Sequence, residues 1–288
     1  MSKDLIFLPG LKDIAGQYDA ILCDVWGVIH NGREGFDAAC DALVRFRAGG
    51  GRVCLITNAP VPKAQVLRYF KPLGIPDAAF DDCVSSGDAT RAVLLQHRDV
   101  PIWRLGSDGG WEHDRHLFEG LDLNFVERAD EAKLGLLVGL RDQERDNPED
   151  YQGELAEVAD TGLTLVCANP DIQVRVGDRL VWCAGALARI YERLGGEVIY
   201  PGKPHAAIYD LARDRLSKLG PLATNDRILA IGDGPITDIA GANREGIDAL
   251  YVGSGLAQYE PEVFQQETIR FLRGEGVRAR YAQAALRW

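Results

Sequence analysis

The chain has 288 residues, of which 46% are hydrophobic and 26% are charged, and its formal net charge is −11. This length and composition exclude a disordered segment, a collagen-like fibre and a small disulfide-stapled domain, and they leave room for two domains. No stretch approaches the ~18 uncharged apolar residues of a membrane-spanning helix. The acidic balance argues against nucleic acid as a partner, because neutralising its phosphates requires a basic surface.

The six cysteines are spread singly along the chain, without a C-x-x-C pair. We interpret them as reduced structural residues rather than as zinc ligands or disulfides. The first eleven residues lack the basic start and the long apolar stretch of a secretory signal peptide. The sequence therefore predicts a cytoplasmic protein with no membrane partner.

Short apolar runs alternate with helical patterns from one end of the chain to the other. Strands are predicted at residues 20–23, 53–57, 163–168, 228–232 and 249–253, and helices at 37–48, 63–70, 89–97, 184–194 and 206–219. Apolar runs of this length are typical of parallel strands buried on both faces, and their alternation with helices indicates an α/β fold with right-handed crossovers. The charged stretch 141–150 is interpreted as an exposed loop or the start of a helix.

Side chains that can carry chemistry follow four apolar runs. They are Asp24, Thr57 with Asn58, Lys203 in a Pro-Gly-Lys-Pro segment, and Asp233 with Asp238. Taken singly, each could be an ordinary turn, cap or surface residue. In an open α/β sheet, however, the residues after the strands meet at one edge, where ligands bind. We therefore expect these residues to lie together at one edge of one sheet.

Such a set suits phosphoryl transfer. Asp24 and Asp233 could share a Mg²⁺ ion, a hard cation that proteins hold through one or two carboxylates. With Lys203 neutralising the phosphate, Asp24 could attack phosphorus and form an aspartyl-phosphate. The Thr57 hydroxyl and nearby backbone N–H groups would hold the remaining phosphate oxygens. The cation would also let a protein with a net charge of −11 bind an anion locally.

These segments, in this order, resemble the haloacid dehalogenase (HAD) superfamily of Mg²⁺-dependent aspartyl-phosphate hydrolases over nearly the whole chain. The resemblance narrows to the class IIA, NagD-like subgroup through Gly232-Asp233-x-x-x-Thr237-Asp238, Gly202-Lys203-Pro204, Ser85-Ser86-Gly87 and Asn169-Pro170-Asp171. It implies a doubly wound parallel-sheet core made of residues 1–86 and 201–288. It also implies an inserted α/β cap domain at residues 87–200 that closes over the cleft.

Carried over position by position, the resemblance implies a role for each motif residue. Asp24 would be the nucleophile, and Lys203 would steady both the nucleophile and the phosphate. Phosphate or substrate would be bound by Thr57 and Asn58, with Trp26 and Gly27 beside them, and by Asn169 and Asp171 on the cap side. The metal would be held by Asp24, the backbone carbonyl of Trp26, Asp233 and Asp238, the last either directly or as a neighbouring carboxylate.

Position 26 departs from the family pattern. The family's phosphatases usually carry an aspartate two residues after the nucleophile, which protonates the leaving oxygen and later activates the hydrolytic water. An indole cannot carry that proton. Trp26 therefore predicts a slow phosphatase, or one for substrates with good leaving groups, or a protein that binds phosphate esters without hydrolysing them. His30 or His205 could substitute as the acid, and the Asp-Val-Trp-Gly form also resembles an uncharacterised branch of class IIA.

Competing motifs do not fit. A dinucleotide site needs G-x-G-x-x-G after the first strand, a Walker A loop needs a different glycine spacing before its lysine, and Ser85 lacks a G-x-S-x-G context. The favoured function is Mg²⁺-dependent hydrolysis of a small phosphomonoester, either a sugar phosphate or a nucleotide. The alternative is a non-catalytic, regulatory protein that binds a phosphorylated metabolite. Members of the family often associate through the cap, so the resemblance allows a homo-oligomer.

Overall fold

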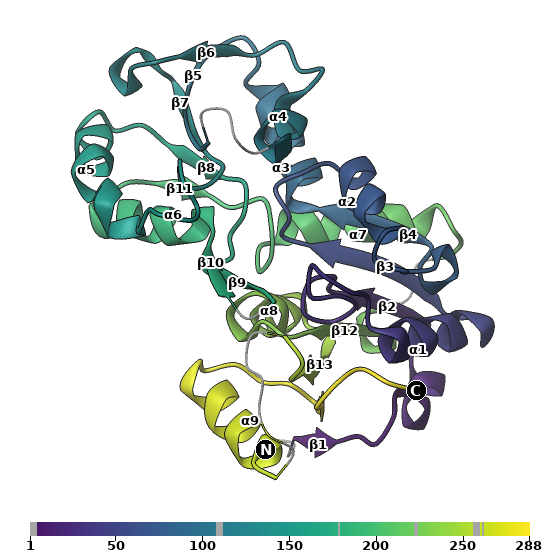
Figure 1. Ribbon diagram of the computed structural model, residues 1–288. Helices are drawn as coiled ribbons and strands as arrows, with labels where there is room; N and C mark the ends of the chain where they lie inside the picture. The colour runs from purple at the N-terminus through teal and green to yellow at the C-terminus, as the bar shows by residue number, and fades with distance from the viewer. Residues whose placement is uncertain (1–4, 108–111, 178, 222–223, 256–259, 261) are drawn as a thin grey trace.

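The structure, a computed structural model, describes residues 5–107, 112–177, 179–221, 224–255, 260 and 262–288. It contains two separate parallel sheets, one of seven strands and one of five, each with helices on both faces (Figure 1). The predicted α/β class is therefore confirmed. In the part of the chain that the structure describes, no helix has the length and apolar character needed to cross a bilayer.

The seven-stranded sheet forms the core domain. In spatial order its strands are β1 (Ile6–Phe7), β14 (Tyr281–Gln283), β13 (Asp248–Val252), β12 (Ile228–Gly232), β2 (Ala20–Cys23), β3 (Arg52–Thr57) and β4 (Asp82–Ser85), and all neighbours are parallel. The central strands β2 and β12 are buried along their whole length. Their continuous apolar sequence follows from this burial, because neither face meets water.

Helices cover both faces of the core sheet. On one face lie α1 (Asp37–Ala48) and α2 (Lys63–Phe70), and on the other lie α7 (Ala206–Ser217), α8 (Ala240–Glu245) and α9 (Phe264–Gly274). Successive side chains of a strand point to opposite faces, so Ile21 packs in the first hydrophobic cluster and Leu22 in the second. The core is thus doubly wound, as predicted.

The five-stranded sheet forms an inserted domain. Its order is β11 (Val198–Ile199), β8 (Leu165–Cys167), β7 (Leu134–Leu137), β5 (Pro101–Leu105) and β6 (Asn124–Val126), again all parallel. One face packs against α5 (Gln152–Asp160) and α6 (Ala184–Arg193), and the other against α3 (Ser86–Gln96) and α4 (Glu112–Phe118). The predicted boundaries at 87 and 200 stay predictions.

An antiparallel hairpin, which the sequence did not predict, projects from the inserted domain. It consists of β9 (Gln173–Val176) and β10 (Arg179–Trp182), which pair with each other and with neither sheet. Figure 1 shows the hairpin where the inserted domain meets the core domain. All four residues of β9 are only partly buried, which explains why its sequence lacks the apolar run that marks the sheet strands.

Predicted and observed elements agree closely in the core domain. The strands predicted at 20–23 and 228–232 coincide with β2 and β12. In the inserted domain, the strand predicted at 163–168 is shorter than expected, because β8 spans only Leu165–Cys167. The helix predicted from residue 89 begins three residues earlier. It does so because the Ser85 side chain caps the helix by accepting a hydrogen bond from the Asp88 backbone N–H at 2.9 Å.

Candidate active site

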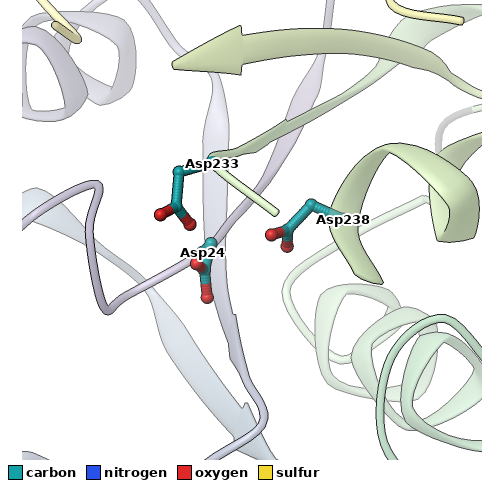
Figure 2. A group of neighbouring side chains, drawn as sticks. All are labelled: Asp24, Asp233 and Asp238. Carbon is teal, nitrogen blue, oxygen red and sulfur yellow. The ribbon is translucent and has the colours of Figure 1, made fainter. Parts of the chain in front are cut away.

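Three carboxylates converge at the carboxyl edge of the core sheet (Figure 2). Asp24 directly follows β2 and Asp233 directly follows β12, while Asp238 comes from the turn after β12. One oxygen from each carboxylate lies within 4.8 Å of the other two. The three residues are 4–6% exposed, so this concentration of negative charge is nearly removed from water.

A single π-helical turn brings Asp238 back to the strand end. It spans Pro235–Ile239, and the Gly234 backbone N–H donates to Asp238 Oδ2 at 3.0 Å. Wide turns of this kind are rare and occur mostly at functional sites. The turn therefore lies between Asp233 and the carboxylate of Asp238, which comes five residues later and returns to the same cluster.

Two glycines leave room for the Asp233 carboxylate. A Cβ on Gly255 would lie 1.7 Å from Asp233 Oδ2, and a Cβ on Gly27 would lie 2.5 Å from the same atom. Gly27 also has a φ of +86°, a left-handed conformation that favours glycine. Both positions therefore require glycine for the site to keep this shape.

Lys203 is the cation of the cluster. Its Nζ lies 2.6 Å from Asp24 Oδ1 and 2.7 Å from Asp238 Oδ1, and the residue is 2% exposed. Burial alone would lower the pKa of Lys203, but the surrounding carboxylates outweigh it and hold the pKa well above its ordinary value. Lys203 is therefore a permanently charged bridge between two of the three carboxylates.

Lys203 does not follow a strand of the core sheet, which corrects the expectation that all the motifs end strands of one sheet. The strand before it, β11, belongs to the inserted domain, and Lys203 lies on the return to the core domain before α7. The Asn58 side chain holds this segment: Asn58 Oδ1 accepts from the Lys203 backbone N–H at 2.8 Å, and Asn58 Nδ2 donates to the Lys203 carbonyl at 3.2 Å. The Asn58 amide thus positions Lys203; Asn58 also lines the cleft, and its predicted contact with phosphate stays a prediction.

Burial also raises the pKa values of the acids around Lys203. It raises the pKa of Asp24 against the opposing pull of Lys203, and it raises the pKa of Asp238 to about 6. Asp171, which reaches the cleft from the inserted domain, has a pKa raised by the same cause and accepts a hydrogen bond from Asn58 Nδ2 at 2.9 Å. These buried carboxylates would therefore be stabilised in their ionised forms by additional positive charge in the site.

The donor set fits a hard divalent cation. Four aspartates, one lysine and one arginine line the cleft, a formal charge of −2 that a divalent ion would cancel. Asp24 and Asp233 supply the carboxylate oxygens that Mg²⁺ prefers. Asp238 already accepts hydrogen bonds at both oxygens, from Lys203 and from Gly234, so it fits better as the carboxylate that steadies this arrangement than as a direct ligand.

The remaining predicted residues fall into two groups. Thr57 and Gly27 line the cleft with Asp171, and Thr57 is 4% exposed. Asn169 is not among the cleft-lining residues of the described chain; its side chain instead accepts from the Asp171 backbone N–H at 3.1 Å. Asn169 therefore orients Asp171, and the substrate contact predicted for Asn169 stays a prediction.

Trp26 lines the cleft at the position of the family's acid, and neither proposed substitute reaches the cleft. His30 is 4% exposed, packs edge-on against the Trp26 ring, and accepts the Gly32 backbone N–H at Nδ1; burial lowers its pKa to about 4. His205 stacks on Tyr200 beside a different hollow. Both histidines are packing residues, which corrects the suggestion that one of them donates the proton.

Comparison with known proteins agrees with this geometry. Residues 21–122 match the haloacid dehalogenase-like hydrolase family, and residues 200–269 match a family described as HAD-hydrolase-like. A crystal structure of a haloacid dehalogenase-like hydrolase from Brucella suis is 40% identical, covers 97% of this chain and 100% of its own, and superposes with a TM-score of 0.84. The chain belongs to the HAD family.

Curated relatives of this HAD hydrolase are more distant. The 5'-nucleotidase YutF of Bacillus subtilis is 25% identical over 84% of this chain and 90% of its own length. An acid sugar phosphatase of Staphylococcus epidermidis is 24% identical over 84% of this chain and 89% of its own length. These relatives support the class IIA assignment made from the motifs, and they confirm the expected kind of enzyme, a HAD hydrolase whose named relatives are phosphatases.

Several cleft residues of this HAD hydrolase were not predicted as site residues, among them Asn31 and two groups that differ in the signal their sequence carried. Ser254 and Gly255 line the cleft just after β13, and the Ser254 hydroxyl donates to the Gly27 carbonyl at 2.9 Å. The rule applied to the other strand ends would have found them. The second group, Gln173, Val174 and Arg175 of β9, carried no comparable signal, because only the tertiary structure brings the hairpin to the cleft.

Proposed function

We propose that this HAD hydrolase is a Mg²⁺-dependent phosphatase that hydrolyses a small phosphomonoester through an aspartyl-phosphate on Asp24. The observation that carries the proposal is the buried junction of Asp24, Asp238 and Lys203 with Asp233 beside it, at the carboxyl edge of the core sheet. Metal binding would fall to Asp24, Asp233 and the Trp26 carbonyl. A bound Mg²⁺ would supply charge neutralisation and orientation for the phosphate.

Asp24 carries out the first chemical step. A carboxylate oxygen of Asp24 attacks phosphorus, the bond between phosphorus and the ester oxygen breaks, and the leaving alcohol departs with the bonding electrons. Through the 2.6 Å contact Lys203 favours the ionised form of Asp24 against the effect of burial, and it would offset the charge of the phosphate. The Thr57 hydroxyl, which lines the cleft at the end of β3, would donate to a phosphate oxygen.

Water completes the reaction. It attacks the phosphorus of the aspartyl-phosphate, and the bond between phosphorus and the Asp24 oxygen breaks. Inorganic phosphate leaves, and the Asp24 carboxylate is regenerated. Trp26 supplies no proton to the leaving oxygen, so that proton must come from solvent. Leaving groups that are stable as anions should therefore react fastest.

The substrate that we propose is a sugar phosphate or a nucleotide. Support comes from the relatives named as 5'-nucleotidase and acid sugar phosphatase. It also comes from the polar side chains of Gln173 and Asn31, which line the cleft together with Trp26. Residues 87–200 would then act as the cap, and the cleft-lining residues of β9 support this role.

Phosphate release from a panel of phosphomonoesters tests the proposal, with Mg²⁺ or with EDTA. Asp24→Asn removes the nucleophile, and Asp41→Asn is the matched control because Asp41 lies exposed on α1 and pairs only locally with Arg45. We expect release that requires Mg²⁺, disappears in Asp24→Asn and persists in Asp41→Asn. Equal release by the wild-type and Asp24→Asn proteins for every ester would rule out hydrolysis through Asp24.

A second function, binding of a phosphorylated metabolite without turnover, is favoured by one observation. The indole N–H of Trp26 donates to the Arg175 carbonyl at 2.7 Å, so the position that carries the acid in related phosphatases makes a structural contact here. Calorimetric binding of phosphate esters by a protein that fails to hydrolyse them would support this function.

A further inference from the structure

Trp26 joins the two domains at the cleft. It follows β2 of the core domain, yet its Nε1–H donates to the backbone carbonyl of Arg175, which lies 149 residues later on β9 of the inserted domain, at 2.7 Å. A hydrogen bond between a side chain and a strand carbonyl fixes the strand without depending on the side chain at that position. The contact therefore anchors the hairpin itself.

The loop after β2 holds the indole in place for this contact. The Trp26 ring packs edge-on against His30, with ring centroids 4.9 Å apart. Its far edge lies on the backbone of Gly32, where a Cβ would stand 2.5 Å from the ring. The indole is thus fixed on two sides before it meets the hairpin, so little side-chain entropy remains to be lost on docking.

A second contact at the hairpin turn lies on the same loop. A Cβ on Gly177 would be 2.4 Å from the guanidinium carbon of Arg33, so the turn after β9 rests against the Arg33 side chain. On β9, before this turn, Gln173, Val174 and Arg175 line the cleft that also contains Asp24. The hairpin is therefore a roof over the nucleophile, supported at its middle and near its turn.

We propose that Trp26 is a positioning residue, whose indole N–H anchors β9 over Asp24 and thereby sets which phosphomonoesters the cleft retains. The inference rests on the proposed phosphatase function for its kinetic consequence, but the anchoring itself does not require turnover. In this chain, position 26 holds the hairpin closed and contributes no proton.

The test compares Trp26→Phe with the wild-type protein. Phenylalanine keeps an aromatic ring but lacks the N–H donor. Trp288→Phe is the control, because Trp288 is also a partly buried indole that packs on the core domain and lies outside the cleft. Amide hydrogen exchange of residues 173–177 is measured by mass spectrometry for all three proteins, and KM and kcat are measured with p-nitrophenyl phosphate.

In Trp26→Phe we expect exchange in this segment to be about 2- to 10-fold faster, as the loss of one hydrogen bond implies. We expect KM to rise by a similar factor while kcat stays within about 2-fold, whereas a merely structural defect would lower kcat and leave KM unchanged. Trp288→Phe should change neither.

Unchanged exchange in Trp26→Phe would refute the anchor, whatever the activity. Faster exchange with an unchanged KM would refute the role in substrate retention. If the wild-type protein turns over no ester, the proposed phosphatase function fails, and the exchange comparison still decides whether Trp26 holds the hairpin.

Discussion

Replacing His30 by glutamine should change how the stability of the protein depends on pH. His30 is 4% exposed, and its burial lowers the pKa to about 4 from the ordinary value of 6.5. Because the folded pKa is depressed, the folded protein binds fewer protons than the unfolded chain between pH 6.5 and pH 4. The stability contributed by the neutral imidazole is therefore present above pH 6.5 and is lost as the pH falls towards 4.

The size of the effect follows from the two pKa values. A pH of 5 is about 1.5 units below the pKa of the imidazole in the unfolded chain, which is therefore protonated, while the buried imidazole remains mostly neutral. The free energy of unfolding therefore falls by about 2 kcal/mol relative to pH 7.5. Glutamine does not titrate and removes this term. The difference in unfolding free energy between wild type and His30→Gln should therefore shrink by about 2 kcal/mol from pH 7.5 to pH 5.

Urea denaturation at the two pH values, followed by circular dichroism, measures this difference. At pH 7.5, the difference in unfolding free energy between the two proteins measures the packing against Trp26 and Phe70 that His30→Gln loses. This contribution does not depend on pH. Parallel stability curves for the two proteins would show that His30 titrates normally in the folded state and would refute its assignment as a neutral packing residue.

Three further outcomes are expected. Lys203→Met leaves two buried carboxylates facing each other, and it should lower the free energy of unfolding by about 3–5 kcal/mol and abolish turnover; a protein with wild-type stability by urea denaturation would contradict the account of Lys203. Gly255→Ala displaces the Asp233 carboxylate, and the Mg²⁺ concentration for half-maximal activity should rise about 10- to 100-fold, whereas an unchanged Mg²⁺ titration would place the metal elsewhere. Without a protonating group at position 26, kcat/KM for p-nitrophenyl phosphate should exceed that for an alkyl phosphate by at least about 100-fold, and similar values for both esters would reveal another acid.

The sequence alone determined the fold of the core domain and most of the candidate active-site cluster. Runs such as residues 20–23 and 228–232 are apolar throughout because both faces of a central parallel strand are buried. Parallel strands end at one edge, so Asp24 and Asp233 had to meet there once both were recognised as following strands. Local pattern and topology point to the same answer at these positions.

The tertiary structure decided the features that the sequence pattern could not predict. Lys203 arrives from the second sheet, and the Asn58 amide that holds it lies 145 residues away. The half-buried β9 strand has no apolar run, so its place over the cleft depends on contacts with the loop after β2. The histidines at 30 and 205 lie near motif residues in sequence, yet both turn into packing contacts away from the cleft. Sequence proximity does not fix the direction of a side chain, because that direction is set by what packs against it from distant parts of the chain.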